Sequence, residues 1–188
     1  DGTLDLSNPE KYFTNKTKIV CVIHQSNVFG TVNPITEIVK YAHEVGALVL
    51  VDGAQSTPHH RVNVTELNCD FFAFSGHKMM GPTGVGALYT KPEILEAMNP
   101  FLGGGEMIRK VTLEGSTWND IPWKFEAGTP NIAQVIGLGS ALDCINKIGT
   151  DTINDYENEL LKCAQGKLQA IPGINIYVSA KDKGAVIS

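Results

Sequence analysis

The chain has 188 residues and a formal net charge of −5, and 43% of its residues are hydrophobic against 19% that are charged. This balance provides enough apolar material for a folded core and too little charge for a disordered chain. The acidic net charge and the lack of a long Lys/Arg run argue against the basic surface that is typical of nucleic-acid binding. No apolar run approaches the roughly 20 residues of a membrane-spanning helix. We therefore expect neither nucleic acid nor a membrane as a partner.

The cysteines bear on compartment and metal binding. They are far apart in the sequence and form none of the short pairs that bind zinc: Cys21, Cys69, Cys144 and Cys163. We expect no metal site and a reducing compartment, either the cytoplasm or an organelle such as a plastid. Each cysteine is expected to be a small, buried hydrophobic residue.

The first predicted elements form a βαβ unit. Residues 18–23 (KIVCVI) are an apolar, β-branched run, the pattern of a strand buried on both faces of a parallel sheet. Pro34 opens a segment with apolar residues at helical spacing, which ends near Gly46. Residues 47–51 (ALVLV) repeat the buried-strand pattern. A strand, a helix and a strand within about 35 residues predict a parallel sheet.

The next predicted elements extend this sheet. Residues 69–74 (CDFFAF) are predicted to form a third strand, and residues 85–89 (VGALY) a fourth. The connection of about ten residues between them is too short for a helical crossover, so the fourth strand is predicted to be antiparallel. A short helix is expected over residues 92–98, followed by a glycine-rich loop over residues 101–106.

The last third of the chain is predicted to be mainly helical. Residues 111–125 contain two tryptophans in a polar stretch that we interpret as irregular or hairpin-like. Long helices are expected over residues 132–148 and 151–171, and a strand of a different sheet over 174–178. We predict a partial large domain over residues 1–150 and the start of a small domain over 151–188. The first residue is not Met, and the last five residues (GAVIS) resemble the beginning of a strand, so we interpret the chain as a fragment.

Polar residues follow three of the predicted strands. In open α/β sheets, ligands bind at the carboxyl ends of the strands. The residues expected to meet at that edge are His24, Ser26 and Asn27, then Asp52 and Gln55, and then Ser75, His77 and Lys78.

Lys78 and Asp52 suggest a particular cofactor. Lys78 lies beside two methionines and a Gly-Pro-Thr-Gly turn. This setting favours a partly desolvated, nucleophilic amine that forms Schiff bases. A carboxylate at the mouth of a parallel sheet, such as that of Asp52, keeps a pyridine nitrogen protonated and its ring an electron sink. The pair predicts pyridoxal phosphate, whereas each residue alone would be read as a surface lysine or a polar strand terminator.

Four segments in order resemble a known family. They are VDGAQS (51–56), FSGHKMMGPTGVGALY (74–89), GGGEMI (103–108) and WKFEAGTPN (123–131). Together they resemble the class V aminotransferase family of pyridoxal-phosphate enzymes, and specifically the SufS-like (group II) cysteine desulfurases. The resemblance implies the type I fold of these transferases, with a mostly parallel sheet, one antiparallel strand and the start of a small α+β domain.

The resemblance assigns roles around the cofactor ring. It implies that Lys78 forms the internal aldimine and that Asp52 pairs with the pyridine nitrogen. Gln55 would hydrogen-bond the ring hydroxyl. Asn27 would lie near the cofactor and the substrate.

The resemblance also assigns the phosphate contacts. Ser75 and His77 would hold the phosphate within one subunit. Gly128 and Thr129 would reach the phosphate of the partner subunit's cofactor, because the enzymes of this family are homodimers.

The implied reaction is cysteine desulfuration. L-Cysteine would be converted to L-alanine, with Lys78 removing a proton and an enzyme cysteine taking the sulfur as a persulfide. The sulfur would serve iron–sulfur cluster or thio-cofactor assembly, with a SufE- or SufU-type acceptor protein. The family's nucleophilic cysteine, ring-stacking histidine and carboxylate-binding arginine match no residue of this chain. We therefore expect the chain by itself not to turn over cysteine.

Other functions remain open at this point. A selenocysteine lyase or a kynureninase-like member of the family would have the same cofactor site. A cofactor-free scaffold is disfavoured because Lys78 and Asp52 are both present. A dinucleotide enzyme is excluded because no GxGxxG follows the first strand. His43, His59 and His60 are expected to be ordinary surface histidines.

Overall fold

A four-stranded sheet forms the centre of the computed structural model, which describes residues 2–177 and 180–188. The sheet has the order β1-β2-β3-β4, with β1 at Ile19–Ile23, β2 at Leu48–Asp52, β3 at Phe71–Ser75 and β4 at Gly86–Thr90. The first three strands are parallel, and β4 is antiparallel to β3. The predicted mixed α/β sheet is thus confirmed.

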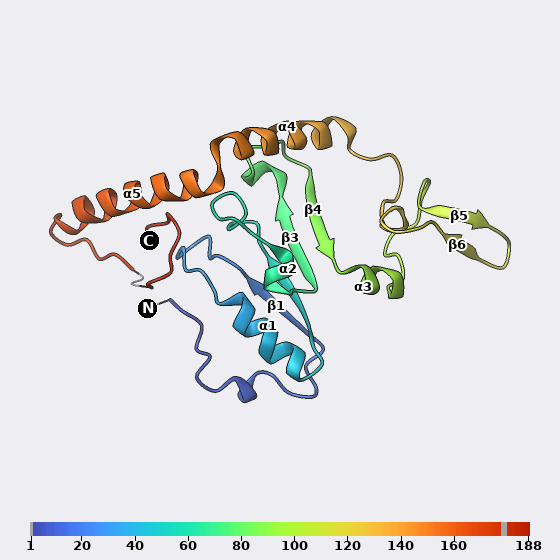
Figure 1. Ribbon diagram of the computed structural model, residues 1–188, viewed down its shortest axis with the longest axis horizontal. Coiled ribbons are helices and arrows are strands. Elements are labelled where there is room, and N and C mark those ends of the chain that lie inside the picture. The colour runs from blue at the N-terminus through green and yellow to red at the C-terminus, as the bar shows by residue number, and fades with distance from the viewer. Residues whose placement is uncertain (1, 178–179) are drawn as a thin grey trace.

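One face of the sheet is covered by the helix that connects β1 to β2 (Figure 1). This helix, α1 (Ile35–Glu44), buries Ile35, Ile38, Val39 and Ala42 along one stripe. The stripe packs on Val49 and Val51 of β2 and on Phe72 of β3. Each buried Ile, Val or Phe side chain of this set contributes about 1.5–3 kcal/mol, and Ala42 contributes less. The short helix α2 (Val64–Leu67) follows, on the way to β3.

The opposite face of the sheet is open along β1. The side chains of β1 alternate in burial, and Ile19, Cys21 and Ile23 are exposed. The prediction that this strand is buried on both faces is therefore wrong. Alternate residues of a strand point to opposite faces, and α1 covers only one of them. By register, Asp52 and Ser75 share the open face with the exposed residues of β1.

A lobe extends from the sheet beyond β4 (Figure 1). Helix α3 (Pro92–Ala97) leads into it, and β5 (Ile108–Val111) pairs antiparallel with β6 (Ser116–Trp118). This pairing agrees with the irregular or hairpin-like structure predicted over residues 111–125, although the hairpin begins earlier, at Ile108. A 3-10 turn, η3 (Trp123–Phe125), brings the chain back toward α3.

Two long helices complete the described fold. They are α4 (Ile132–Ile148) and α5 (Thr150–Gln169), as predicted. Leu138 and Ile145 of α4 pack on Met79, which directly follows Lys78. None of the helices formed by residues 2–177 and 180–188 is long and apolar enough to cross a membrane.

The chain after α5 departs from the prediction. Residues 174–177 form no strand, and residue 178 of the predicted strand lies outside the described residues. An extended segment becomes a strand only where a ladder of backbone bonds joins it to a neighbour. Here Tyr177 N donates to Ser188 O at 2.7 Å, and the described residues add no further bond of a ladder. The final segment instead lies on the loop after β1, where Val32 N donates to Asp182 O at 3.0 Å. The division into domains at residue 150 stays a prediction.

A buried carboxylate ties three elements together at the amino ends of the strands. Asp70, only 3% exposed, precedes β3 and accepts a hydrogen bond from Val49 N at 2.7 Å. Its carboxylate also lies 2.8 Å from His43 Nε2 and 2.9 Å from Lys91 Nζ. Burial alone would raise the pKa of Asp70, but the bonds from His43, Lys91 and Val49 outweigh it and hold this pKa below its ordinary value.

We predict that Asp70→Asn lowers the free energy of unfolding by about 3 kcal/mol at neutral pH, because Lys91 loses its buried partner. Since the pKa of Asp70 is depressed on folding, the charge stabilises the fold above the unfolded pKa. That stabilisation is lost as the pH falls through the folded pKa. Urea unfolding of both proteins from neutral to acidic pH measures this, with the exposed Asp143→Asn as the control. Equal stability of Asp70→Asn and the unchanged protein at pH 7 would contradict the prediction.

Candidate active site

The carboxyl ends of β1, β2 and β3 meet at one edge of the sheet. His24 N, directly after β1, donates to Asp52 O at 2.8 Å, and Gly53 N, directly after β2, donates to Ala73 O at 2.8 Å. These backbone bonds hold the three loops that follow the strands beside one another. The polar residues predicted at the strand ends therefore do lie along one edge.

The central contact of this edge joins Lys78 to Gln55. Lys78 Nζ donates a hydrogen bond to Gln55 Oε1 at 3.1 Å, across two different loops. Lys78 ends the 3-10 turn η2 (Gly76–Lys78), and its side chain is half-buried, as the sequence predicted. A Cβ at Gly76 would lie 2.7 Å from Val85 Cγ1, so only glycine lets this turn pack against the approach to β4.

Asp52 ends β2 with an accessible carboxylate. Its Oδ1 accepts a hydrogen bond from Ala54 N at 2.9 Å, which fixes the orientation of the group at the start of the loop. The backbone of the next residue, Gly53, lies against the Phe72 ring of β3. A Cβ at this position would lie 2.0 Å from Phe72 Cζ, so only glycine fits here. Glycine at this position brings the loop with Gln55 down onto the end of the sheet.

Ser75 provides an observation that bears on a bound ligand. Its hydroxyl oxygen is buried and has no hydrogen-bond partner among the described residues. Leaving a buried polar group unpaired costs about 1–3 kcal/mol, so such a group is expected to be satisfied by a ligand or by water. Together with an amine, a carboxylate and an amide at the same edge, this hydroxyl fits a phosphorylated cofactor. His77, two residues further, is exposed.

The loop after β1 differs in part from expectation. The Ser26 hydroxyl accepts hydrogen bonds from Val28 N at 3.2 Å and Phe29 N at 3.0 Å, so it stabilises a turn. Asn27 is exposed in that turn, and within the described residues it forms no hydrogen bond with Lys78 or Asp52. Within the described part of the chain, Asn27 therefore lies at the edge without a hydrogen bond to the Lys78–Gln55 pair.

His24 is a neutral imidazole at this edge. Its ring meets that of Phe72 edge-on, with the ring centroids 6.4 Å apart. Burial and the neighbouring His60 lower the pKa of His24 to about 4, so the ring is uncharged at neutral pH. Its Nδ1 is buried without a partner among residues 2–177 and 180–188.

Gly128 and Thr129 belong to a different loop from Lys78. They belong to the loop between the lobe and α4, and Gly128 N donates to Gly105 O at 2.9 Å (Figure 1). Gly128 has a φ of +84°, a left-handed conformation that favours glycine. Thr129 is exposed. The predicted role of both residues toward a partner's cofactor stays a prediction.

Two sets of secondary predictions are wrong. Only Cys69 is buried, where burial raises the pKa of its thiol, whereas the cysteines on the open sheet face and the long helices are exposed: Cys21, Cys144 and Cys163. The three histidines expected on the surface are half-buried and paired. Besides His43, His59 Nδ1 lies 2.8 Å from the Glu157 carboxylate and His60 Nε2 lies 2.8 Å from Gln25 Oε1. The pairing partners come from distant parts of the sequence, which a local pattern does not reveal.

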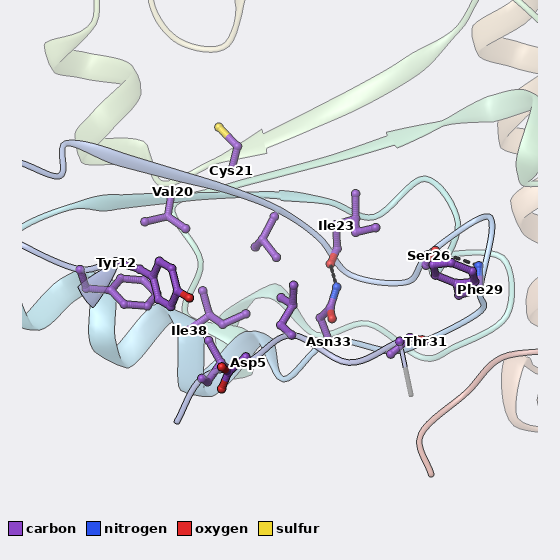
Figure 2. A pocket seen from close by; sticks show the side chains of 15 residues that line it. Asp5, Tyr12, Val20, Cys21, Ile23, Ser26, Phe29, Thr31, Asn33 and Ile38 are labelled. Atoms are coloured by element: carbon purple, nitrogen blue, oxygen red, sulfur yellow. Dashed lines mark hydrogen bonds between the residues drawn. The ribbon is translucent and has the colours of Figure 1, made fainter. Parts of the chain in front are cut away.

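A cavity of about 730 Å³ lies elsewhere, between β1 and the N-terminal segment (Figure 2). Tyr12, Val20 and Ile38 contribute to its mostly apolar wall, and Ser26 and Phe29 lie at one end. Neither Lys78 nor Asp52 lines this cavity. Its chemistry does not match the polar edge, so the edge is the candidate site.

Known proteins resemble this chain along its whole length. The aminotransferase class-V family matches residues 1–188. A probable cysteine desulfurase from Halalkalibacterium halodurans is 53% identical over 186 residues, which cover 99% of this chain and 46% of that protein. A solved apo structure of a cysteine desulfurase from Thermococcus onnurineus has a TM-score of 0.92 and 40% identity, and the match covers 99% of this chain and 47% of that one.

A further solved structure shows the cofactor in a similar protein. A mutant of C-DES has glycine covalently linked to its PLP cofactor, with a TM-score of 0.79 and 27% identity over 93% of this chain and 47% of that one. The chain spans about half the length of the relatives it matches. Its described residues have the α/β fold of these enzymes, and the family match covers the whole sequence. The chain belongs to the class-V aminotransferase family.

Proposed function

We propose that this chain forms the cofactor-binding part of a pyridoxal-phosphate-dependent cysteine desulfurase. The observation that carries the proposal is the Lys78–Gln55 hydrogen bond of 3.1 Å at the edge where β2 ends in Asp52. The similar proteins named cysteine desulfurase support L-cysteine as the substrate. The products would be L-alanine and sulfur carried as an enzyme-bound persulfide.

Different residues of this edge would bind different groups of the cofactor. When bound, pyridoxal phosphate supplies a carbonyl group that attaches an amine and a ring that accepts electrons. Lys78 would hold it covalently, and the Asp52 carboxylate would keep the ring nitrogen protonated. Gln55 Oε1 accepts the hydrogen bond from Lys78 Nζ, so the side-chain amide nitrogen of Gln55 remains available to donate to the ring hydroxyl.

The phosphate and the substrate involve the remaining residues. Ser75 Oγ and His77 would bind the phosphate within one subunit, and Asn27 would lie near the substrate. Lys78 would remove the substrate proton, and its bond to Gln55 holds the amine in place. Gly128 and Thr129 would complete the phosphate site of the partner in a homodimer. A sulfur-acceptor protein of the SufE or SufU type and use of the sulfur in iron–sulfur cluster or thio-cofactor assembly belong to the same proposal.

We predict that Lys78→Ala abolishes the visible absorbance that pyridoxal phosphate gives with the full-length protein, because the covalent link is lost. Alanine release from cysteine should fall by about 10³-fold, since the amine also removes the substrate proton. An absorbance titration and an alanine assay measure both effects. Lys110→Ala, which changes an exposed lysine of the hairpin, serves as the control. A Lys78→Ala protein that keeps the absorbance would sink the proposal.

Ser75→Ala separates ligand binding from folding. The hydroxyl has no hydrogen-bond partner among the described residues, so its removal should leave the free energy of unfolding unchanged or slightly higher. The same change should weaken binding of pyridoxal phosphate about tenfold, because a hydrogen bond to a charged group is lost. Pyridoxal, which lacks the phosphate, should bind both proteins alike. Equal affinity of the two proteins for pyridoxal phosphate would show that Ser75 does not hold the phosphate.

A further inference from the structure

Lys124 is a buried lysine that the proposed reaction does not use. It lies in η3 at the base of the lobe and is only 9% exposed. Its Nζ donates hydrogen bonds to Leu95 O at 3.1 Å and to Glu96 O at 3.0 Å. The amine also lies 5.4 Å from the centre of the Phe125 ring. This lysine is therefore held in one position by backbone carbonyls and an aromatic face.

The two carbonyls belong to the end of α3. The last carbonyls of a helix lack partners within the helix and carry the negative end of its dipole, so a cation is favoured there. Among the described residues, no carboxylate pairs with Lys124. The charge of Lys124 is therefore stabilised by the carbonyl groups at the end of α3. A single residue separates α3 from β4 of the central sheet.

The loop after Lys124 is held from both sides. Glu126 N donates to Trp123 O at 3.0 Å, which continues the turn that contains Lys124. Two residues later, Gly128 N donates to Gly105 O at 2.9 Å. Beyond the loop, Asn131 Nδ2 donates to Gly84 O at 2.8 Å, in the turn that follows Lys78. Residues 126–131 are thus fixed between α3, the glycine-rich loop and the active-site turn.

We propose that Lys124 is a positioning residue for the loop with Gly128 and Thr129. By binding the end of α3, it sets this loop relative to the sheet and presents the exposed Thr129 to the cofactor phosphate of a partner subunit. Lys124 itself does not touch the cofactor. This inference rests on the proposed function, in which Gly128 and Thr129 complete the partner's phosphate site.

The test uses the full-length homodimer and four variants. Lys124→Met removes the charge and the donors at similar length, and Lys124→Arg keeps both. Thr129→Ala removes the side chain that the loop presents, and the double variant Lys124→Met with Thr129→Ala tests whether the two residues act together. Absorbance titrations give the dissociation constants of pyridoxal phosphate and of pyridoxal. The latter lacks the phosphate and serves as the matched ligand.

We expect Lys124→Met to weaken the binding of pyridoxal phosphate about tenfold, because the displaced Thr129 no longer hydrogen-bonds the charged phosphate. Pyridoxal binding should change less than about twofold, and Lys124→Arg should restore most of the lost affinity. Thr129→Ala should have an effect of similar size, and the double variant should bind no more weakly than Thr129→Ala alone. If Lys124→Met does not fold, Lys124→Gln, which keeps one pair of donors without the charge, takes its place.

Two results would overturn the inference while leaving the proposed function intact. One is an equal loss of affinity for pyridoxal phosphate and pyridoxal in the Lys124 variant, which indicates a general effect on the fold. The other is a double variant whose loss is the product of the two single losses. By contrast, the proposed function itself is rejected if the protein without substitutions and Lys78→Ala give the same absorbance with pyridoxal phosphate.

Discussion

The parallel register of the first three strands is the constraint on which the candidate site depends. The bonds from His24 N to Asp52 O and from Gly53 N to Ala73 O hold the carboxyl ends of the strands side by side. Residues more than twenty positions apart in the sequence can then form a hydrogen bond, as Lys78 Nζ does with Gln55 Oε1 at 3.1 Å. Helix α1 packs on one face of the sheet and supports it, and the candidate site residues lie at the ends of the strands and in the loops that follow them.

The sequence predicted this framework because its apolar runs are long enough to be distinctive. The runs at residues 18–23 and 47–51 and the helical stripe between them correspond to β1, β2 and α1. The antiparallel direction of β4 followed from the shortness of its connection. The open face of the sheet was not predictable in the same way, because an apolar strand reveals a need for burial and not what provides it.

The site was predictable as a set of residues and less so as a set of contacts. The positions of Asp52, Gln55, Ser75 and Lys78 along one edge followed from the order of the strands. The unpaired hydroxyl of Ser75 and the pairing of His59 with Glu157 depend on tertiary packing that no local pattern records. Lys124 was missed for a related reason, since its partners are backbone carbonyls, which have no signature in the sequence.

The most direct test of the account is to find which lysine carries the cofactor. The full-length protein is incubated with pyridoxal phosphate and reduced with borohydride, which makes the link between amine and cofactor permanent. Its peptides are then mapped by mass spectrometry. The account predicts the added mass on the peptide that contains Lys78 and none on the peptide with the buried Lys124. A modification at another lysine, or no modification at all, would contradict the assignment of this edge as the cofactor site.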